Sequence, residues 1–354
     1  MQYLSERARR VQPYVPGEQP QGQTFIKLNT NENPYPVSPR VLHAIQHTLL
    51  TRGIERYPDP RCTDLAQAVS EARGINPAWV FSGNGSDEVL AFAFMAFYWG
   101  EILNAPDITY SFYPVYAGLF DVDYRTVPLL ADFSVDVDAL CRSEGGVILA
   151  NPNAPTGIAL PLSDVEKIIA AHPGDVVIVD EAYIDFCGDS AVELIAGYPN
   201  LLVVQTLSKF AALAGMRVGF AMGQPHLIDG LCRVRDSFNS YTVNALSNAA
   251  GAAALRDTEY LGEQTARICA TRHRITVALT DMGCEVLPSR TNFLMVSAPG
   301  LTGHALYTGL KKKGILVRYF SSPERLAPYV RITIGTDEDM DTVCAAIAQI
   351  LEEE

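Results

Sequence analysis

The chain has 354 residues, of which 48% are hydrophobic and 19% charged, so it can bury a large core and is not a disordered protein. Its formal net charge of −13 argues against binding nucleic acid or an anionic membrane surface. The longest apolar run, 89–99, is too short to span a bilayer, and the N-terminus lacks the apolar segment of a secretory signal. Seven scattered cysteines without a Cys-x-x-Cys pair predict reduced thiols in a cytoplasmic protein, with no disulfide framework and no metal site.

The first 36 residues are rich in Pro, Gly, Gln and Asn, which predicts an extended arm. Tyr14 and Leu28 are too apolar for a free tail, so we expect the arm to pack against another part of the protein. Two helices capped at both ends are predicted next, at about 38–50 and 63–74.

Four short apolar runs rich in β-branched residues follow, at 147–150, 176–179, 201–204 and 218–221. Strands that are apolar on both faces belong to a sheet covered on both sides, which predicts an α/β fold with a mostly parallel central sheet covered by helices. In such sheets ligands bind beyond the carboxyl ends of the strands. The residues of interest are therefore those that follow the runs, at 151–157, 180–183 and 206–209.

The C-terminal third has a different pattern. A helical, Ala-rich stretch from about 236 to 281 is long enough to link two domains, and the strand-like and helix-like pieces that alternate after it predict a smaller α/β domain. We expect an arm at 1–36, a large domain at 37–255 and a small C-terminal domain at 256–354.

Three charged residues follow or begin these strands. Lys209 is costly at the end of a buried strand unless it is deprotonated, paired or used covalently, although a loop could also carry it to the surface. Arg217 cannot lose its charge, and no acidic residue occurs between Gln205 and Gln224, so a ligand phosphate is as good a partner as a buried carboxylate. Asp180 could bind a metal, cap a helix or pair with a cationic ring nitrogen; no His–carboxylate cluster supports the metal.

A glycine-containing loop, Ser82-Gly83-Asn84-Gly85-Ser86-Asp87-Glu88, precedes the apolar helix. Its free backbone and the helix N-terminus can bind an anion, although ordinary capping explains the same residues. The loop is neither a Walker loop nor Gly-x-Gly-x-x-Gly, which disfavours a nicotinamide cofactor. A lysine for covalent attachment, an aspartate for a pyridinium nitrogen and a phosphate cup together indicate a pyridoxal phosphate site.

Nearly the whole chain resembles the class I/II aminotransferases of fold type I and, within that family, the histidinol-phosphate aminotransferases. The blocks that carry the resemblance occur in the family's order: 27–34, 56–60, 151–157, 180–183, 208–217 and 329–335. One position departs from the pattern, because Ala154 stands where the family has an asparagine that contacts the phenolic oxygen of the cofactor. We expect Asn153 to replace it, with Asn151 as the second choice.

The resemblance also implies roles for residues. Lys209 would bind pyridoxal 5'-phosphate covalently and then move the substrate proton, Asp180 would keep the ring nitrogen protonated, and Tyr183 would hydrogen-bond the phenolic oxygen. Tyr110 would stack on the ring, with Tyr113 as the alternative. The other implied cofactor contacts are Gly85, Ser86, Asp87, Asn153, Thr206, Ser208 and Arg217, together with Tyr57 from the partner subunit of a homodimer with shared active sites. Arg331, assisted by Arg318 and with Asn29 nearby, would bind the substrate anions.

The implied reaction transfers the amino group of L-histidinol phosphate to 2-oxoglutarate, a step of histidine biosynthesis. Two alternatives within the fold stay open: an aromatic amino-acid aminotransferase and a threonine-phosphate decarboxylase. A non-catalytic regulator of the same fold is also possible, but it would be expected to have lost Lys209 or Asp180, and both are present.

Overall fold

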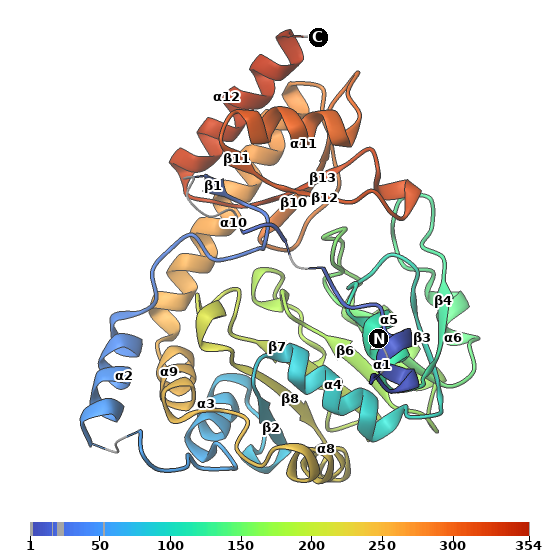
Figure 1. The fold of residues 1–354 in the computed structure, drawn as a ribbon, viewed down its shortest axis with the longest axis vertical. Helices are drawn as coiled ribbons and strands as arrows, with labels where there is room; N and C mark the ends of the chain where they lie inside the picture. Colours follow the sequence, from blue (N-terminus) through green and yellow to red (C-terminus); the bar gives the residue numbers. More distant parts are fainter. Residues whose placement is uncertain (1–2, 16, 20–24, 52–53, 354) are drawn as a thin grey trace.

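The computed structural model describes residues 3–15, 17–19, 25–51 and 54–353, so parts of the expected arm lie outside the described residues. Figure 1 shows a larger part built around a seven-stranded sheet and a smaller part built around a four-stranded sheet. The long helix α10 (Thr258–Asp281) runs from one part into the other. Within the described residues, no helix combines the length and the apolar character needed to cross a membrane.

The seven-stranded sheet has the order β2-β8-β7-β6-β5-β3-β4. Neighbouring strands are parallel, except that β8 runs antiparallel to both β7 and β2. The strands are β2 (Val80–Gly83), β3 (Ile102–Pro106), β4 (Asp123–Val127), β5 (Gly146–Ala150), β6 (Val177–Asp180), β7 (Leu201–Thr206) and β8 (Gly219–Gly223). The predicted mostly parallel sheet is therefore confirmed, and its four central apolar strands are those that the sequence indicated.

Helices cover both faces of this sheet, which explains the continuous apolar runs. Along β5, Val147 and Leu149 pack on one face and Ile148 on the other, and none of the three is exposed. The first face is covered by α3 (Thr63–Arg73), α6 (Val137–Cys141), α7 (Leu162–Ala171) and α9 (Ala245–Leu255), and the second by α4 (Ser86–Phe97), α5 (Tyr113–Leu119) and α8 (Pro225–Phe238).

The two early helices begin in different ways. Before α2 (Pro39–Thr51), the hydroxyl of Ser38 accepts a hydrogen bond from the N–H of Arg40, as the predicted N-cap requires. The start of α3 has no side-chain cap from the residue before it; instead the carboxylate of Asp59 accepts the N–H of Thr63 at 2.8 Å. Gly74 ends α3 as expected, with a φ of 68° in the left-handed region that favours glycine.

The smaller part holds an antiparallel sheet of order β12-β13-β10-β9. Its elements are β9 (Glu285–Val286), β10 (Phe293–Ser297), α11 (Gly303–Lys312), β11 (Ile315–Leu316), β12 (Arg318–Tyr319), β13 (Val330–Thr333) and α12 (Asp337–Glu352). The described chain also contains short 3-10 helices, at Pro77–Trp79, Ile184–Phe186, Ala191–Leu194, Ala214–Met216 and Glu324–Leu326.

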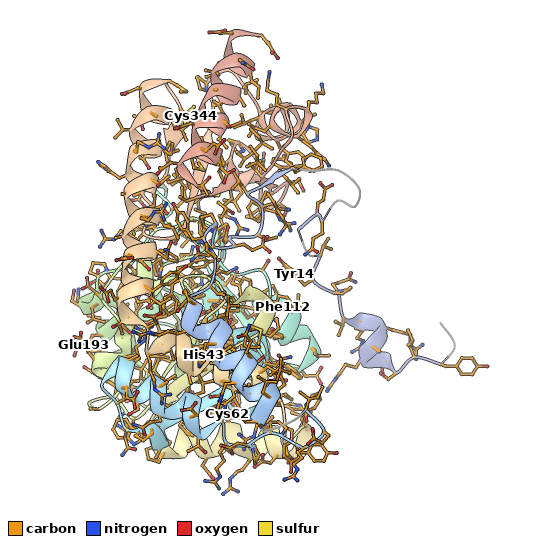
Figure 2. The ribbon with its side chains drawn as sticks, turned by 90° about the vertical axis from the view of Figure 1, so that its left-hand side faces the viewer. Tyr14, His43, Cys62, Phe112, Glu193 and Cys344 are labelled. Carbon is orange, nitrogen blue, oxygen red and sulfur yellow. The ribbon has the colours of Figure 1, made fainter. Side chains whose placement is uncertain are left out.

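Two pieces of the N-terminal segment contact different parts of the protein. β1 (Ile26–Lys27) pairs in parallel with β11 of the smaller part, and Leu28 connects β11 to β13, because its N–H donates to the carbonyl oxygen of Leu316 and its carbonyl oxygen accepts from the N–H of Thr333. Further upstream, Tyr14 stacks on Phe112 with ring centroids 4.5 Å apart, and Figure 2 shows α1 (Glu6–Arg10) at the edge of the molecule, where Arg7 forms an ion pair with Asp121. No residue of α1 is buried.

Candidate active site

A cavity of about 230 Å³ lies at the carboxyl ends of β5, β6 and β7, where Thr30 and Glu32 of the N-terminal segment complete its wall. The topology explains its position, since parallel strands present their carboxyl ends at one edge and α4 begins there. Nine residues predicted from the sequence line it: Ser86, Asp87, Tyr110, Asp180, Tyr183, Thr206, Ser208, Lys209 and Arg217.

Lys209 follows β7 and reaches into the cavity, where its Nζ donates to the carbonyl oxygen of Thr30 at 3.1 Å. Desolvation, together with the nearby positive charge of Arg331, lowers the pKa of Lys209 to about 8. About a tenth of this amine is therefore neutral at pH 7, far more than for a lysine with a pKa of 10.5. It can act as a nucleophile or accept a proton, which a normal surface lysine cannot do.

Asp180 ends β6 and is 4% exposed. Its carboxylate accepts hydrogen bonds from the hydroxyl of Tyr113 at 2.8 Å and from the N–H of Ala182 at 3.2 Å. Burial raises the pKa of Asp180 to about 6, against the opposing effect of these two donors. Among the described residues no cation pairs with Asp180, so this buried carboxylate is suited to a cationic ring nitrogen. Tyr113 is fully buried and binds Asp180 instead of lining the cavity.

The Arg217 guanidinium does have a carboxylate partner, Asp87, which lies 130 residues upstream at the start of α4. The Nη2 of Arg217 donates to Asp87 at 2.8 Å, and the hydroxyl of Tyr110 donates to the other carboxylate oxygen at 2.8 Å. Asp87 thus fixes both the arginine and the tyrosine that line the cavity. A negative side chain in this place would repel an anion, so only the backbone of Asp87 suits anion binding.

Two glycines allow the close approach of backbone that builds this corner. Gly85 has a φ of 88°, and a Cβ there would lie 2.5 Å from Nη2 of Arg217. A Cβ on Gly219 would lie 2.2 Å from the backbone nitrogen of Ser86. These positions let β8 press against the N-terminus of α4, whose free N–H groups then face the same corner as Arg217.

Two hydroxyls complete that corner. The hydroxyls of Thr206 and Ser208 lie 2.9 Å apart and are hydrogen-bonded, and both residues are buried at the cavity wall. The Thr206 hydroxyl has one hydrogen and can give it to the carbonyl oxygen of Val218 at 3.1 Å, whereas the Ser208 hydroxyl can rotate to donate to a ligand. The guanidinium, the helix N-terminus and the serine hydroxyl together form a cup of donors for an anion.

The structure does not bring Asn153 to the cavity. Its amide donates to the carbonyl oxygen of Ile108 and to the hydroxyl of Thr156, and its side-chain oxygen accepts from Thr109, so it holds the loop together. Asn151 is used in the same way, in a pair of hydrogen bonds with the backbone of Leu160. Neither asparagine lines the cavity, where Ala154 presents only a methyl group.

Tyr183 lines the cavity and is 8% exposed. Its hydroxyl oxygen accepts a hydrogen bond from the amide of Asn31 at 2.8 Å. Asn31 was not singled out from the sequence, although it lies in the 27–34 block. Burial raises the pKa of Tyr183, while the charge of Arg331 and the Asn31 bond act in the opposite direction.

A second recess of about 290 Å³ adjoins the first and shares Tyr110 and Ala154 with it. It is lined by Arg318 and Arg331, with Tyr14 of the N-terminal segment on its wall. Arg331, on β13, stacks between the rings of Phe293 and Phe320, at 5.2 and 5.5 Å from their centroids.

The Arg331 guanidinium lacks an ionic partner. Its Nε is buried without a hydrogen bond, its Nη2 makes only a 3.3 Å bond to the carbonyl oxygen of Asn29, and no ion pair reaches it within the described part of the chain. Desolvation lowers the pKa of Arg331, as expected of a charge without a counter-ion. Asn29 itself is buried behind the arginine and donates to the carbonyl oxygen of Glu18.

Tyr57 does not line the cavity of its own chain. It is 82% exposed and stacks on Tyr241, at a ring distance of 4.6 Å, beside a surface recess formed by 49–51 and 55–59.

Comparisons with known proteins agree with this architecture. Residues 23–347 match the model of the family described as aminotransferase class I and II. The chain therefore belongs to the class I and II aminotransferases, and the fold type I expected from the sequence is confirmed. Histidinol-phosphate aminotransferase from Clostridium acetobutylicum is 49% identical over 96% of both chains, and histidinol-phosphate aminotransferase 2 from Burkholderia mallei is 50% identical over 99% of both. The crystal structure of histidinol-phosphate aminotransferase from Sinorhizobium meliloti, in complex with pyridoxal-5'-phosphate, has a TM-score of 0.89, with 27% identity over 100% of this chain and 98% of that one.

Proposed function

We propose that this chain is a pyridoxal phosphate-dependent aminotransferase that converts L-histidinol phosphate and 2-oxoglutarate into imidazole acetol phosphate and L-glutamate, a step of histidine biosynthesis. The observation that carries the substrate assignment is Arg331, a guanidinium without a counter-ion that faces the recess next to Lys209. Both proposed substrates present an anion that a guanidinium can bind through two hydrogen bonds. The names of the two relatives that are about half identical support the same assignment.

The residues of the cavity fit the cofactor. Asp180 is a buried carboxylate without a cationic partner, and a protonated pyridine nitrogen would supply that partner. At the other end, the cup formed by Arg217, Ser208 and the N-terminus of α4 fits a phosphate. Between these ends lie Lys209, the ring of Tyr110, and Tyr183, whose hydroxyl hydrogen is free to donate to a phenolic oxygen.

When bound, pyridoxal phosphate supplies an electrophilic carbon for the substrate amine and a conjugated ring that accepts electrons. The side chains of the protein supply the attachment point, the proton transfer and the substrate-binding contacts. Lys209, with its pKa lowered to about 8, attaches the cofactor and, once released, carries a proton from the amino-bearing carbon of the substrate on its Nζ. Asp180 keeps a proton on the ring nitrogen, and Arg331 orients the substrate through its anion.

The proposal is tested with a panel of amino donors and 2-oxoglutarate. L-histidinol phosphate should give the highest kcat/KM, and histidinol should be much poorer because it lacks the anion. Faster turnover of phenylalanine or tyrosine would indicate an aromatic aminotransferase. Release of carbon dioxide from threonine phosphate would indicate the decarboxylase, and failure to bind pyridoxal phosphate at all would leave only the fold.

We further propose a cytoplasmic homodimer in which the arm packs on the small domain and on the partner subunit, and Tyr57 reaches the partner's phosphate cup. The support is a surface rich in exposed apolar side chains near Tyr57: Leu50 (86%), Ile54 (74%) and Phe238 (73%). Exposed apolar side chains in such number are typical of interfaces. The seven cysteines are free thiols, which suits a reducing compartment.

A hybrid experiment tests the shared site. Mixed and re-associated Lys209→Ala and Tyr57→Ala proteins form some dimers in which one site has both residues intact. Activity should rise to as much as about a quarter of the wild-type value, since half of the random dimers are hybrid and one of their two sites is intact. If activity does not rise on mixing, the shared site is excluded. It is also excluded if sedimentation at the assay concentration shows that the active species is a monomer.

A further inference from the structure

Asn31 is connected to both parts of the protein through its polar groups. It is 1% exposed and adopts a φ of 56°, in the left-handed region that favours glycine and asparagine. Its backbone N–H donates to the hydroxyl of Thr333 on β13, and its carbonyl oxygen accepts from the amide of Asn292. Its side-chain amide donates to the hydroxyl oxygen of Tyr183 in the larger part.

The direction of the Asn31 side chain is fixed by Thr333. The hydroxyl of Thr333 already accepts the N–H of Asn31 at 3.0 Å, so its own hydrogen is available as a donor. It donates to the side-chain oxygen of Asn31 at 3.2 Å. The side-chain nitrogen must therefore face Tyr183, and the hydrogen bond between the two runs from the amide to the phenol.

This direction determines what Tyr183 can do. Because its oxygen accepts from Asn31, its hydrogen is free, and no described residue accepts it. The other tyrosine that lines the cavity, Tyr110, donates its hydroxyl hydrogen to Asp87. Ala154 has no polar side chain, and the side chain of Asn153 is used within its own loop. Tyr183 is thus left as the hydroxyl donor at the Ala154 side of the cavity.

We propose that Asn31 is a positioning residue for the cofactor: its amide holds the phenol of Tyr183 so that the hydroxyl hydrogen points at the phenolic oxygen of bound pyridoxal phosphate. This inference rests on the proposed function. The Asn31 bond also acts to lower the pKa of Tyr183, which strengthens the phenol as a donor. In this chain the correctly directed tyrosine compensates for the asparagine that Ala154 replaces.

The test follows the pH midpoint of the absorbance change of the bound cofactor, which does not depend on turnover. At high pH the phenolic oxygen carries its negative charge without an internal proton, so an external donor stabilises that form more. Loss of the donor should raise the midpoint by about one to two pH units, the size expected for a hydrogen bond to a charged group. Asn31→Gly removes the amide and suits the φ of 56°.

Two further variants and a control make the result specific. Asn31→Asp keeps an acceptor for Thr333 but cannot donate to Tyr183, and should shift the midpoint in the same direction if Asn31→Gly folds poorly. Asn33→Ala removes a neighbouring amide that binds the carbonyl oxygen of Phe210, and should leave the midpoint unchanged. Tyr183→Phe should raise the midpoint, and adding Asn31→Gly to it should produce no further change.

The outcomes separate the two proposals. A wild-type protein that binds no pyridoxal phosphate overturns the proposed function. A wild-type protein that binds it, with a midpoint that Asn31→Gly leaves in place, overturns only the role of Asn31. An equal shift with and without the Tyr183 hydroxyl also overturns that role, because Asn31 would then act through packing alone.

Discussion

Replacing Arg331 by methionine should separate substrate binding from stability. The guanidinium lies between the rings of Phe293 and Phe320, with a buried Nε that has no partner and one long hydrogen bond to the carbonyl oxygen of Asn29. Methionine has similar length and makes favourable contacts with aromatic rings. The substitution therefore keeps most of the packing and removes the charge.

The two expected effects differ in size. Losing a two-donor contact to a substrate anion costs about 2–5 kcal/mol, which corresponds to a fall in kcat/KM of about thirtyfold to a few thousandfold. Stability should change little, since the lost cation–π contacts and hydrogen bond are worth about 1 kcal/mol each. Removal of an unpaired charge and of its repulsion with Arg318 offsets them, so the free energy of unfolding should stay within about 1 kcal/mol of wild type.

The assay combines urea unfolding with kcat/KM for histidinol phosphate, 2-oxoglutarate and histidinol. Arg325→Met is a matched control, because Arg325 also stacks on a ring, that of Phe133 at 4.6 Å, but donates to the carbonyl oxygens of Leu129 and Leu130. The control should lose stability and keep its kinetics, the reverse of Arg331→Met. Equal losses with histidinol and with its phosphate would refute the reasoning, as would a destabilisation above about 3 kcal/mol with intact kcat/KM.

Three other predictions concern the cavity. Lys209→Ala should abolish turnover, and borohydride should attach the cofactor to Lys209 in the wild type; a peptide map with the label on Lys27 would contradict this. Asp180→Asn should lower kcat at least about a hundredfold, a loss of roughly 3 kcal/mol, while cofactor absorbance shows that binding persists; near-normal turnover would make Asp180 structural. The pKa of Lys209, about 8 rather than 10.5, means that the folded apoprotein binds this proton more weakly than the unfolded chain. The free energy of unfolding should therefore rise as the pH increases from about 8 towards 10.5 in urea titrations, and Lys209→Met should remove that rise.

The sequence predicted the central strands well because a strand buried on both faces leaves an unambiguous apolar run. β5, β6 and β7 were located this way, and so were Asp180 and Lys209 beyond their ends. β2, β3 and β4 were not located. β4 has no buried residue, and β3 contains a polar residue, Asn104, and ends at a proline, so neither has a continuous apolar run.

Features of the site that depend on distant contacts could not be predicted. The partner of Arg217 lies 130 residues upstream, and Asn31 contacts side chains 152 and 302 residues away. Adjacency to Ala154 in the chain predicts Asn153 as the replacement, but the loop turns the side chain of Asn153 inwards. Sequence adjacency therefore failed there, while a left-handed asparagine far upstream supplied the polar contact to Tyr183 that no pattern had indicated.

The pairing of β1 with β11 has a consequence for how the protein can be divided. The smaller part is not a continuous stretch of chain, because residues 26–27 at its edge precede the whole central sheet. A fragment cut out at residue 256 would lose this strand and expose the backbone donors and acceptors of β11, an open edge that favours self-association. A circular permutant that joins the present termini and opens the chain in the loop before α10 would keep the strand with its neighbour. Truncating that permutant at about residue 36, after the N-terminal segment, would give the smaller part together with its strand as a single chain.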